Sequence, residues 1–298
     1  MDTKRIAVTG GTGTLGRLLV AELGRRGHEV RVLSRSSGEH PIDLDTGAGL
    51  AEALDGCEVV VDASNNRSAK RAPRTMVEGA RRLLEAERAA GVGHHVCVSI
   101  VGCDRLPSGY FRVKADQERV VTEGSVPWSV VRATQFHEMM DEMFALGARM
   151  RLLPVPRARM RTVAAVEAAG VIAGVAEGEP LLDRIEVGGP EETELRDLAR
   201  TWRSVTGRRT LLLRVPVPGG FGRALREGVA VPDAPDAVGR TPFGGWLIER
   251  QAHRKEQAQR AREARRVKEA RVRKASVRKA GVKEARVEEA RVEEAQRR

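Results

Sequence analysis

Aromatic residues are scarce in this sequence. Three Trp, five Phe and one Tyr occur among 298 residues, so Tyr110 is the only candidate for chemistry that needs a phenol. Long apolar runs are absent as well, and none approaches the roughly 20 residues that cross a bilayer. The chain reaches an apolar segment at Ile6, which leaves no room for a secretory signal peptide. We therefore expect a cytoplasmic protein with no membrane partner.

Cysteine is equally rare. Cys57, Cys97 and Cys103 are odd in number, and their spacing does not match that of metal-binding motifs. We therefore expect three reduced thiols, as in the cytoplasm, and no bound metal ion.

Basic charge is confined to one end of the chain. The formal net charge is +11, but residues 251–298 contain 17 Lys or Arg and 8 Asp or Glu and so carry +9 of it. The preceding 250 residues are close to neutral, with 35 basic and 33 acidic side chains. Residues 1–250 therefore give no sign of a nucleic-acid surface.

The basic C-terminal segment is a repeat with a period of five. KEARV, RKASV, RKAGV, KEARV and EEARV occur between Lys268 and Val292. Successive Val residues would lie about 140° apart around a helix, so no continuous apolar stripe forms and a coiled coil is not expected. A solvated, partly frayed helix or a disordered arm is one interpretation. The other is contact with RNA or another polyanion, which without aromatic residues would not depend on sequence.

The most informative stretch runs from Ile6 to Arg35. A short apolar strand leads into the turn GGTGTLG, and leucines at three- and four-residue spacing then predict an amphipathic helix. Glycines end that helix, and Glu29–Ser34 is the next expected strand. Strand, glycine turn, helix and strand are typical of the first half of a dinucleotide-binding unit. A glycine-rich hairpin without a ligand is the alternative.

Each glycine of the turn has its own role in this interpretation. Gly10 allows the tight turn, Gly13 lets the backbone approach a pyrophosphate, and Gly16 lets the helix pack on the strand. The anion would lie on the N–H groups of the helix N-terminus, where the helix dipole favours negative charge. The expected cofactor contacts here are Gly10, Thr12, Gly13, Thr14, Leu15 and Gly16.

The end of the second strand predicts which nicotinamide cofactor binds. NAD-specific sites usually carry Asp or Glu there, which accepts a hydrogen bond from the ribose 2′-hydroxyl. Ser34 and Arg35 occupy that place here, and a guanidinium group suits a 2′-phosphate. The sequence therefore favours NADP(H). A solvated Arg35 in a surface loop is the alternative.

Further cofactor contacts are expected after the next two strands. Residues 42–44 are predicted to be a third strand, in which Asp43 and Leu44 would contact adenine. Asp43 is equally suited to form a turn. Residues 58–63 are a fourth buried strand, and open parallel sheets bind ligands at the carboxyl ends of their strands. Ala63, Ser64 and Asn65 lie at that end.

Helices and strands are expected to alternate along the rest of the chain. The helices are predicted at residues 50–54, 74–90, 162–175 and 195–206, and the strands at 95–100, 126–131, 185–187 and 209–215.

A Ser–Tyr–Lys set lies between two of these elements. Tyr110 and Lys114 are four residues apart and share one face of a helix, and Ser99 lies near the end of the preceding strand. In a carbonyl reductase Tyr110 would give a proton to the carbonyl oxygen, Ser99 would polarise that oxygen, and Lys114 would stabilise the tyrosinate and bind the ribose. An amphipathic tyrosine beside an unrelated surface lysine is the alternative.

These motifs together resemble the short-chain dehydrogenase/reductase superfamily, specifically its atypical, NmrA-like, NAD(P)H-binding branch. TGGTGTLG has the glycine spacing of extended and atypical members, and SIVGCD, YFRVKADQE and VPWSVVRATQFHE follow one another over Ser99–Glu138. The similarity continues through VGGPEE and VPVPGG and covers roughly residues 3–250. It implies a Rossmann domain with a small C-terminal substrate region.

We therefore predict a doubly wound α/β protein with a parallel Rossmann-type sheet over residues 1–250. Its C-terminal α+β substrate region would span roughly residues 135–250, followed by a charged helical or disordered tail at 251–298. Residues 132–137 are expected to line the substrate cleft, with Gln135, Phe136 and His137 as the candidates. A single His beside a helix start is more often structural than catalytic.

One position departs from the family pattern. Extended members carry Asn-Val-x-Gly-Thr after the fourth strand, and that Asn supports a proton relay. This sequence has Met76-Val77-Glu78-Gly79-Ala80 there, and a thioether holds a relay water poorly. Two functions stay open. One is NADP(H)-dependent hydride transfer to a small carbonyl or quinone-like acceptor. The other is NADP(H) sensing, reported to a protein partner with little or no turnover.

Overall fold

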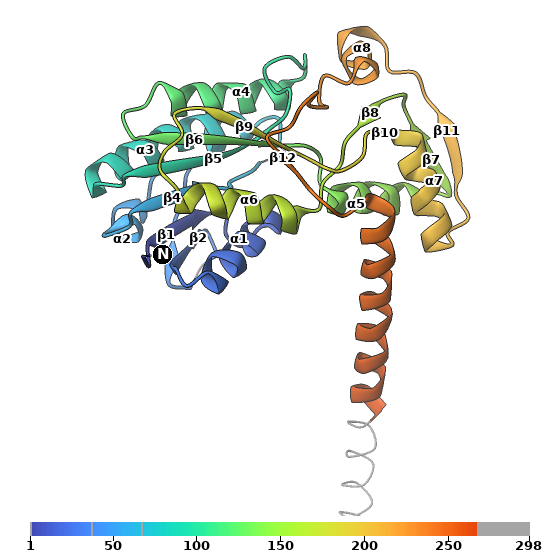
Figure 1. The fold of residues 1–298 in the computed structure, drawn as a ribbon, viewed down its shortest axis with the longest axis horizontal. Helices are drawn as coiled ribbons and strands as arrows, with labels where there is room; N and C mark the ends of the chain where they lie inside the picture. Colours follow the sequence, from blue (N-terminus) through green and yellow to red (C-terminus); the bar gives the residue numbers. More distant parts are fainter. Residues whose placement is uncertain (1, 37, 67, 267–298) are drawn as a thin grey trace, which may run out of the picture. The chain divides into compact units, whose positions relative to one another are not determined.

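The computed structural model of the chain describes residues 2–36, 38–66 and 68–266. An eight-stranded parallel sheet organises them, in the order β12-β9-β6-β5-β4-β1-β2-β3 (Figure 1). The order β3-β2-β1-β4-β5-β6 within it is that of dinucleotide-binding sheets. The predicted doubly wound α/β fold is confirmed. The strands are β1 (Arg5–Thr9), β2 (Glu29–Ser34), β3 (His40–Pro41), β4 (Val59–Asp62), β5 (His94–Ile100), β6 (Trp128–Ala133), β9 (Arg184–Gly188) and β12 (Ala237–Val238).

Helices cover both faces of the sheet and bury its apolar side chains. Alternate residues of β1 point to opposite faces, so Ile6 and Val8 contact one helical layer and Ala7 the other. Helices α1 (Thr14–Arg25) and α6 (Ala165–Glu177) form the first layer and pack on each other. The second layer consists of α2 (Leu50–Leu54), α3 (Gly79–Ala90) and α4 (Gly109–Thr122).

A smaller lobe has a hydrophobic core of its own. Phe144 and Trp202 lie at its centre with their ring centroids 5.9 Å apart, and Phe243, where a later helical segment begins, packs on Phe144. Strands β7 and β11 pair in parallel, and β8 and β10 pair antiparallel. The elements of this lobe are α5 (His137–Ala148), β7 (Leu152–Val155), β8 (Arg159–Met160), β10 (Thr193–Glu194), α7 (Leu195–Thr206), β11 (Leu211–Arg214) and α8 (Gly219–Glu227).

Two predicted elements differ from those observed. The third strand is His40–Pro41 rather than residues 42–44, because Asp43 begins a turn: its side chain accepts the Asp45 N–H at 2.9 Å. The helix predicted from residue 74 begins with a π-helical segment, η1 (Pro73–Glu78), before α3 continues it. Met76 is fully buried in η1.

The chain divides into two compact units, Met1–Leu247 and Ile248–Arg298. The described residues of the second unit, 248–266, are helical. The five-residue repeat between Lys268 and Val292 lies outside the described residues. In the ranges that the structure describes, every helix is too short or too polar to cross a membrane.

Candidate functional site

A cavity of about 970 Å³ lies at the carboxyl ends of the parallel strands. Residues that end or follow β1, β2, β4, β5 and β6 line it, together with residues of α4 and α5. This is the edge at which open α/β sheets bind ligands. The cavity brings together all the predicted cofactor and catalytic residues: Gly10, Thr12, Gly13, Thr14, Leu15, Gly16, Ser34, Arg35, Asp43, Leu44, Ala63, Ser64, Asn65, Ser99, Tyr110 and Lys114.

The glycine turn leaves no room for side chains where β1 passes into α1. Gly10 has φ +65°, and a Cβ added there would lie 2.7 Å from the Ala63 carbonyl oxygen. A Cβ at Gly16 would collide with the Gly10 carbonyl. Gly13 caps α1 without a side-chain hydrogen bond, so the first N–H groups of the helix have no side-chain acceptor. The turn is therefore built to receive an anion on backbone N–H groups.

Three buried polar atoms in the cavity have no hydrogen-bond partner among the described residues. They are Ser64 Oγ, Thr134 Oγ1 and Gln135 Oε1. Leaving such groups unpaired costs free energy, so they indicate a ligand that supplies the missing partners. Together with the glycine turn, these residues fit a dinucleotide cofactor.

Replacing Gly16 by alanine tests this fit. We expect Gly16→Ala to raise the dissociation constant of the cofactor by about tenfold or more, because displacing the Gly10 carbonyl moves the anion-binding N–H groups. Cofactor fluorescence titration measures it. Gly24→Ala is the matched control, since Gly24 lies in the same helix and a Cβ there meets no atom within 4 Å. It should leave binding unchanged and stabilise the helix by about 0.5–1 kcal/mol. Equal binding by both variants would contradict the assignment of the turn.

Lys114 is held from inside the protein rather than by solvent. The buried ammonium group donates to the Val98 carbonyl oxygen at 2.7 Å and to Gln117 Oε1 at 2.9 Å. Gln117 in turn donates from Nε2 to Asp62 Oδ2 at 2.8 Å. Lys114 also lines the cavity, so these bonds fix the position of its charge there. Gln117 lies three residues after Lys114, a helical spacing from which sequence analysis could have found it.

Asp62 is the fixed negative charge of this network. Burial by itself would raise its pKa. The charge of His95 and the hydrogen bonds from Thr9 and the Ser64 N–H outweigh burial and keep the pKa of Asp62 below its ordinary value. The carboxylate is thus ionised and able to orient Gln117.

Tyr110 and Ser99 reach the cavity from different elements and have separate partners. The Tyr110 hydroxyl donates to Asn65 Oδ1 at 2.9 Å. Ser99 is buried at the end of β5, with its Oγ 3.7 Å from Cys103 Sγ. No hydrogen bond joins these two side chains to each other or to Lys114 in the described part of the chain. The catalytic set shares a cavity wall, and its assignment stays a prediction.

The predicted substrate residues are divided by the structure. Gln135 and Phe136 line the cavity, but His137 does not. His137 is fully buried between Thr162 Oγ1 at 2.9 Å and the Thr241 carbonyl at 3.0 Å, and burial lowers its pKa. The prediction that His137 contacts substrate is therefore wrong, because α5 begins at this residue and turns it into the core.

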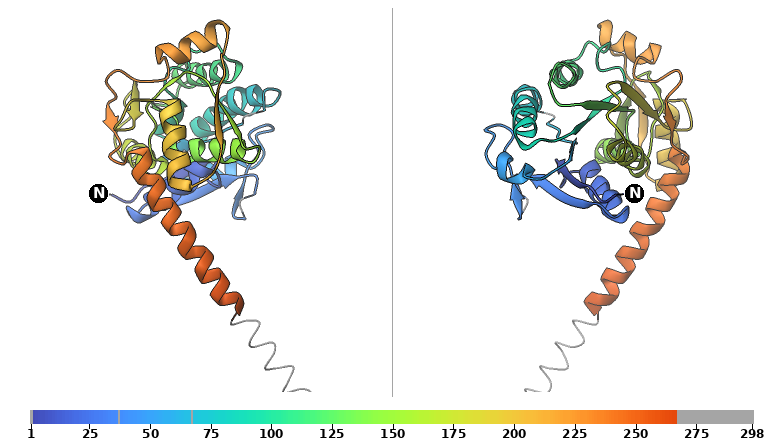
Figure 2. Two further views of the ribbon diagram at one scale, coloured as in Figure 1. Left: turned by 90° about the vertical axis from the view of Figure 1, so that its right-hand side faces the viewer. Right: turned by 60° about the vertical axis from the view of Figure 1, so that its left-hand side comes forward.

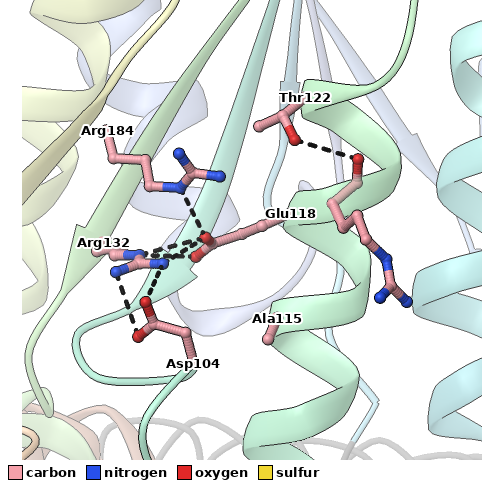
Figure 3. A pocket seen from close by; sticks show the side chains of 7 residues that line it. Asp104, Ala115, Glu118, Thr122, Arg132 and Arg184 are labelled. Carbon is pink, nitrogen blue, oxygen red and sulfur yellow. Dashed lines mark hydrogen bonds and ion pairs between the residues drawn. The ribbon is translucent and has the colours of Figure 1, made fainter.

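The sequence also predicted that Arg132 lines the substrate cleft. This prediction is wrong, because Arg132 does not line the large cavity. Its guanidinium group makes paired bonds to Glu118, with Nε and Nη2 2.9 and 2.7 Å from the two carboxylate oxygens (Figure 3). Arg184 reaches the same carboxylate at 3.2 Å. These groups and Asp104 line a separate cavity of about 250 Å³. Burial and then Glu118 raise the pKa of the adjoining Cys103 thiol to about 12, so it is protonated and donates to Glu118.

Several cavity residues have no signal in the sequence. At the end near β2 and the turn at Asp43, hydrogen bonds link Asn66, Thr75 and Asp45 to one another. At the end near β6, side chains from α4 and α5 complete the wall. The residues that sequence analysis missed include Asp45, Arg71, Thr75, Phe111, Met139 and Glu142. They come from loops and helix faces that only the folded chain brings together.

A parallel sheet whose glycine turn and unpaired polar atoms face one cavity defines a dinucleotide-binding protein. The chain belongs to the NAD(P)H-binding family, whose profile matches residues 10–158.

Comparison with known proteins supports a reductase-like family. The chain is 28% identical over 264 residues to a ceramide reductase of Caulobacter vibrioides, covering 80% of each protein. It is 32% identical over 155 residues to a 4-hydroxy-2-methyl-3-oxo-4-farnesyl-3,4-dihydroquinoline-1-oxide ketoreductase of Stigmatella aurantiaca, which covers 41% of this chain and 46% of that protein. It is also 27% identical over 156 residues to photosystem II assembly factor Ycf39 of Synechocystis, with 48% of each covered.

Solved structures share the fold at lower sequence identity. An NADPH-dependent quinone oxidoreductase of Escherichia coli in complex with NADPH aligns with a TM-score of 0.68 and 17% identity, over 82% of this chain and 99% of that one. A short-chain dehydrogenase/reductase superfamily protein of Agrobacterium tumefaciens with bound NAD gives 0.67 and 19%, over 87% and 99%. Both cofactors occur on this fold, so the fold does not choose between them.

Proposed function

We propose that the chain is an NADP(H)-dependent reductase that transfers a hydride to a carbonyl or quinone-like acceptor. One observation carries the proposal: Ser99, Tyr110 and Lys114 line the same cavity as the glycine turn and the unpaired polar atoms. In this proposal the proton donor, the polarising hydroxyl and the cation act at the one cavity that would hold the dinucleotide. The two relatives named as reductases point to the same chemistry.

Each of these residues has a separate role in the reduction of a carbonyl group. The glycine turn would hold the pyrophosphate, and the cofactor supplies a hydride for the carbonyl carbon when bound. Tyr110 gives its proton to the carbonyl oxygen, so the product is an alcohol, and Ser99 donates a hydrogen bond to that oxygen. Lys114 stabilises the tyrosinate that remains, held in place by Gln117.

This arrangement also accounts for the missing relay residue. Met76 stands where extended relatives carry Asn, and it is fully buried in η1. Lys114 is fixed instead by the Val98 carbonyl and by Gln117, which Asp62 orients. The proton donor must leave Asn65 before it reaches a substrate, since the phenol is bonded there. Such hydrogen bonds commonly rearrange when substrate binds.

Cofactor preference is expected to depend on Arg35. Arg35 lines the cavity directly after β2 and makes no ion pair with a described residue, so its guanidinium group is available to a 2′-phosphate. Arg35→Ala should raise the dissociation constant for NADPH about tenfold to a hundredfold and leave that for NADH within about twofold. Calorimetric titration measures both.

Arg71 lines the same cavity and is the matched comparison. Arg71→Ala should leave the ratio of the two dissociation constants unchanged. If Arg71→Ala abolishes the preference and Arg35→Ala does not, the phosphate contact belongs to Arg71 and the argument from β2 is wrong.

Cofactor sensing is the second candidate function. The bond from Tyr110 to Asn65 and the buried Met76 favour it, since neither serves turnover. In that case a protein partner reads the state of the cofactor. Turnover of a panel of ketones, aldehydes and quinones, followed by NADPH absorbance, distinguishes the two. Tight cofactor binding without oxidation by any acceptor would favour sensing and count against the reductase.

A further inference from the structure

The smaller lobe exposes large apolar side chains that nothing in the described chain covers. They come from the end of α5, from β7 and from β11, and we call them together the α5–β11 surface. Its apolar members are Met143 (41% exposed), Leu146 (63%), Met150 (71%), Leu152 (38%), Leu211 (64%) and Leu213 (43%). Large exposed apolar groups on neighbouring elements indicate an interaction site.

The pairing of β7 with β11 places three of these side chains, together with Pro154, on one face. Leu211 lies opposite Leu152, and Leu213 lies opposite Pro154. The alternate residues Leu153 and Leu212 pack into the core of the lobe. Since side chains of a strand alternate between faces, the other face of this two-stranded sheet is apolar and open.

The end of α5 joins this face. Met150 follows the helix by two residues, and the next carbonyl, that of Arg151, accepts the Leu211 N–H at 3.0 Å. Leu146 lies in the last turn of the helix, four residues before Met150. Figure 1 shows β7 and β11 side by side with α5 next to them, and this end of the lobe faces the viewer in the left panel of Figure 2.

Arginines surround the apolar side chains. Arg149 and Arg151 lie in the α5–β7 turn, Arg208 and Arg209 precede β11, and Arg214 ends it. All five are exposed, and none is ion-paired with a described residue. Residues 149–166 and 198–226 contain no Asp or Glu, and the acids that pair with other arginines of these stretches, Glu194 with Arg157 and Glu192 with Arg159, come from elsewhere in the chain.

Exposed apolar side chains ringed by arginines favour one class of binding partner over the others. A second copy of the chain would bring the same positive charges together, which is unfavourable. A nucleic acid would neutralise the arginines but leave the leucines and methionines without a partner. An anionic bilayer does both, because its headgroups pair with the arginines and its acyl boundary receives the apolar side chains. We propose that the α5–β11 surface docks the protein on the surface of anionic membranes.

Docking of this kind needs no spanning segment, so the absence of long apolar runs does not argue against it. The sequence-based expectation of no membrane partner considered only spanning segments. The α5–β11 surface also continues toward the large cavity. Met139 and Glu142 of α5 line that cavity, and Met143 and Leu146 follow on the same side of the helix. The proposal is nevertheless independent of turnover, because membrane binding is measured without substrate.

Vesicle flotation of the full chain tests the proposal. Wild-type protein should bind vesicles of phosphatidylcholine with about a third phosphatidylglycerol and should not bind phosphatidylcholine alone. The double variant Leu211→Asn, Leu213→Asn should lower the affinity for the anionic vesicles about tenfold, and Arg208→Gln with Arg209→Gln should do the same. Cofactor titration of each variant shows that the fold is intact, and it also separates a failure of docking from a failure of the proposed NADP(H) site.

Matched substitutions elsewhere control for general effects. Leu181→Asn with Leu182→Asn removes two leucines of similar exposure near β9, and Arg81→Gln with Arg88→Gln removes two exposed arginines of α3. Both should bind vesicles like the wild type. The proposal is overturned if the Leu211 and Leu213 double variant also binds like the wild type, because the basic tail would then account for binding. It is equally overturned if that variant dissociates a dimer seen by light scattering.

Discussion

Replacing Tyr110 by phenylalanine is expected to lower kcat for the best acceptor of the panel about 10²–10⁴-fold, the usual contribution of a positioned general acid. The phenol is the only tyrosine hydroxyl in the chain, and it reaches the cavity from the same helix as Lys114. Its loss removes the proton that the carbonyl oxygen takes up. The dissociation constant for NADPH should stay within about twofold, because the variant keeps the ring.

The variant Asn65→Ala distinguishes a catalytic role of Tyr110 from a purely structural one. If the hydrogen bond to Asn65 Oδ1 only stabilises the cavity wall, Asn65→Ala and Tyr110→Phe should lower kcat equally, since each removes that bond. If Tyr110 is the acid, Asn65→Ala frees the phenol, and kcat at saturating NADPH should stay within about threefold of the wild-type value, while loss of the predicted cofactor contact of Asn65 would raise only the KM for NADPH. Full activity of Tyr110→Phe would leave the acid unassigned.

Replacing Glu118 by alanine is expected to destabilise the protein by about 3–5 kcal/mol, because it removes the buried partner of the Arg132 guanidinium group and leaves only the half-exposed Asp104. The carboxylate is 3% exposed and accepts hydrogen bonds from Nε and Nη2 of Arg132 and from Arg184 (Figure 3), and a further one from the Cys103 thiol. The midpoint of thermal unfolding should fall by roughly 10 °C for a domain of this size. Differential scanning calorimetry measures it.

Two further variants separate the ion pair from other effects of the substitution. Asp116→Ala breaks an exposed pair with Arg119 on the same helix, and its effect should stay below about 1 kcal/mol. Glu118→Leu combined with Arg132→Met removes both charges and should recover most of the stability lost in Glu118→Ala. An equal loss in the double variant would mean that packing, rather than the unpaired charge, is responsible.

The ion pair of Glu118 and Arg132 also predicts how stability depends on pH. Burial would raise the pKa of Glu118, but the hydrogen bonds and charge of Arg132 hold it below the ordinary value. A carboxyl group with a lowered pKa in the folded state adds stability above its unfolded pKa and loses that contribution as the pH falls through the folded value. The difference between wild type and Glu118→Ala should therefore shrink in acid.

The agreement between the sequence-based predictions and the structure varies along the chain. Around the glycine turn the predicted elements are those observed: Glu29–Ser34 is a strand, and the residues predicted to bind the cofactor line one cavity, while their role stays a prediction. Such segments are specified by local rules, because glycine spacing and apolar periodicity act over a few residues. The error at residues 42–44 has a local cause too, since Asp43 used its turn-forming ability instead of extending a strand.

The sequence could not decide whether a polar residue near the cleft faces the cavity or the core. His137 and Arg132 were placed at the cleft because they follow a strand that reaches it. The start of α5 turns His137 into the core, and Glu118, 14 residues away in sequence, holds Arg132 behind the cavity. Their positions depend on partners that no local pattern reveals.

The sequence by itself determined the parallel sheet, the glycine turn and the family, because short-range spacing encodes them. Tertiary structure alone decided that Lys114 is held through Gln117 by Asp62, which is more than 50 residues distant in the chain. It also decided that a chain nearly neutral over its first 250 residues gathers unpaired arginines around exposed leucines on one lobe. Both results depend on contacts between distant segments, whose register and facing are set by the packing of the whole core.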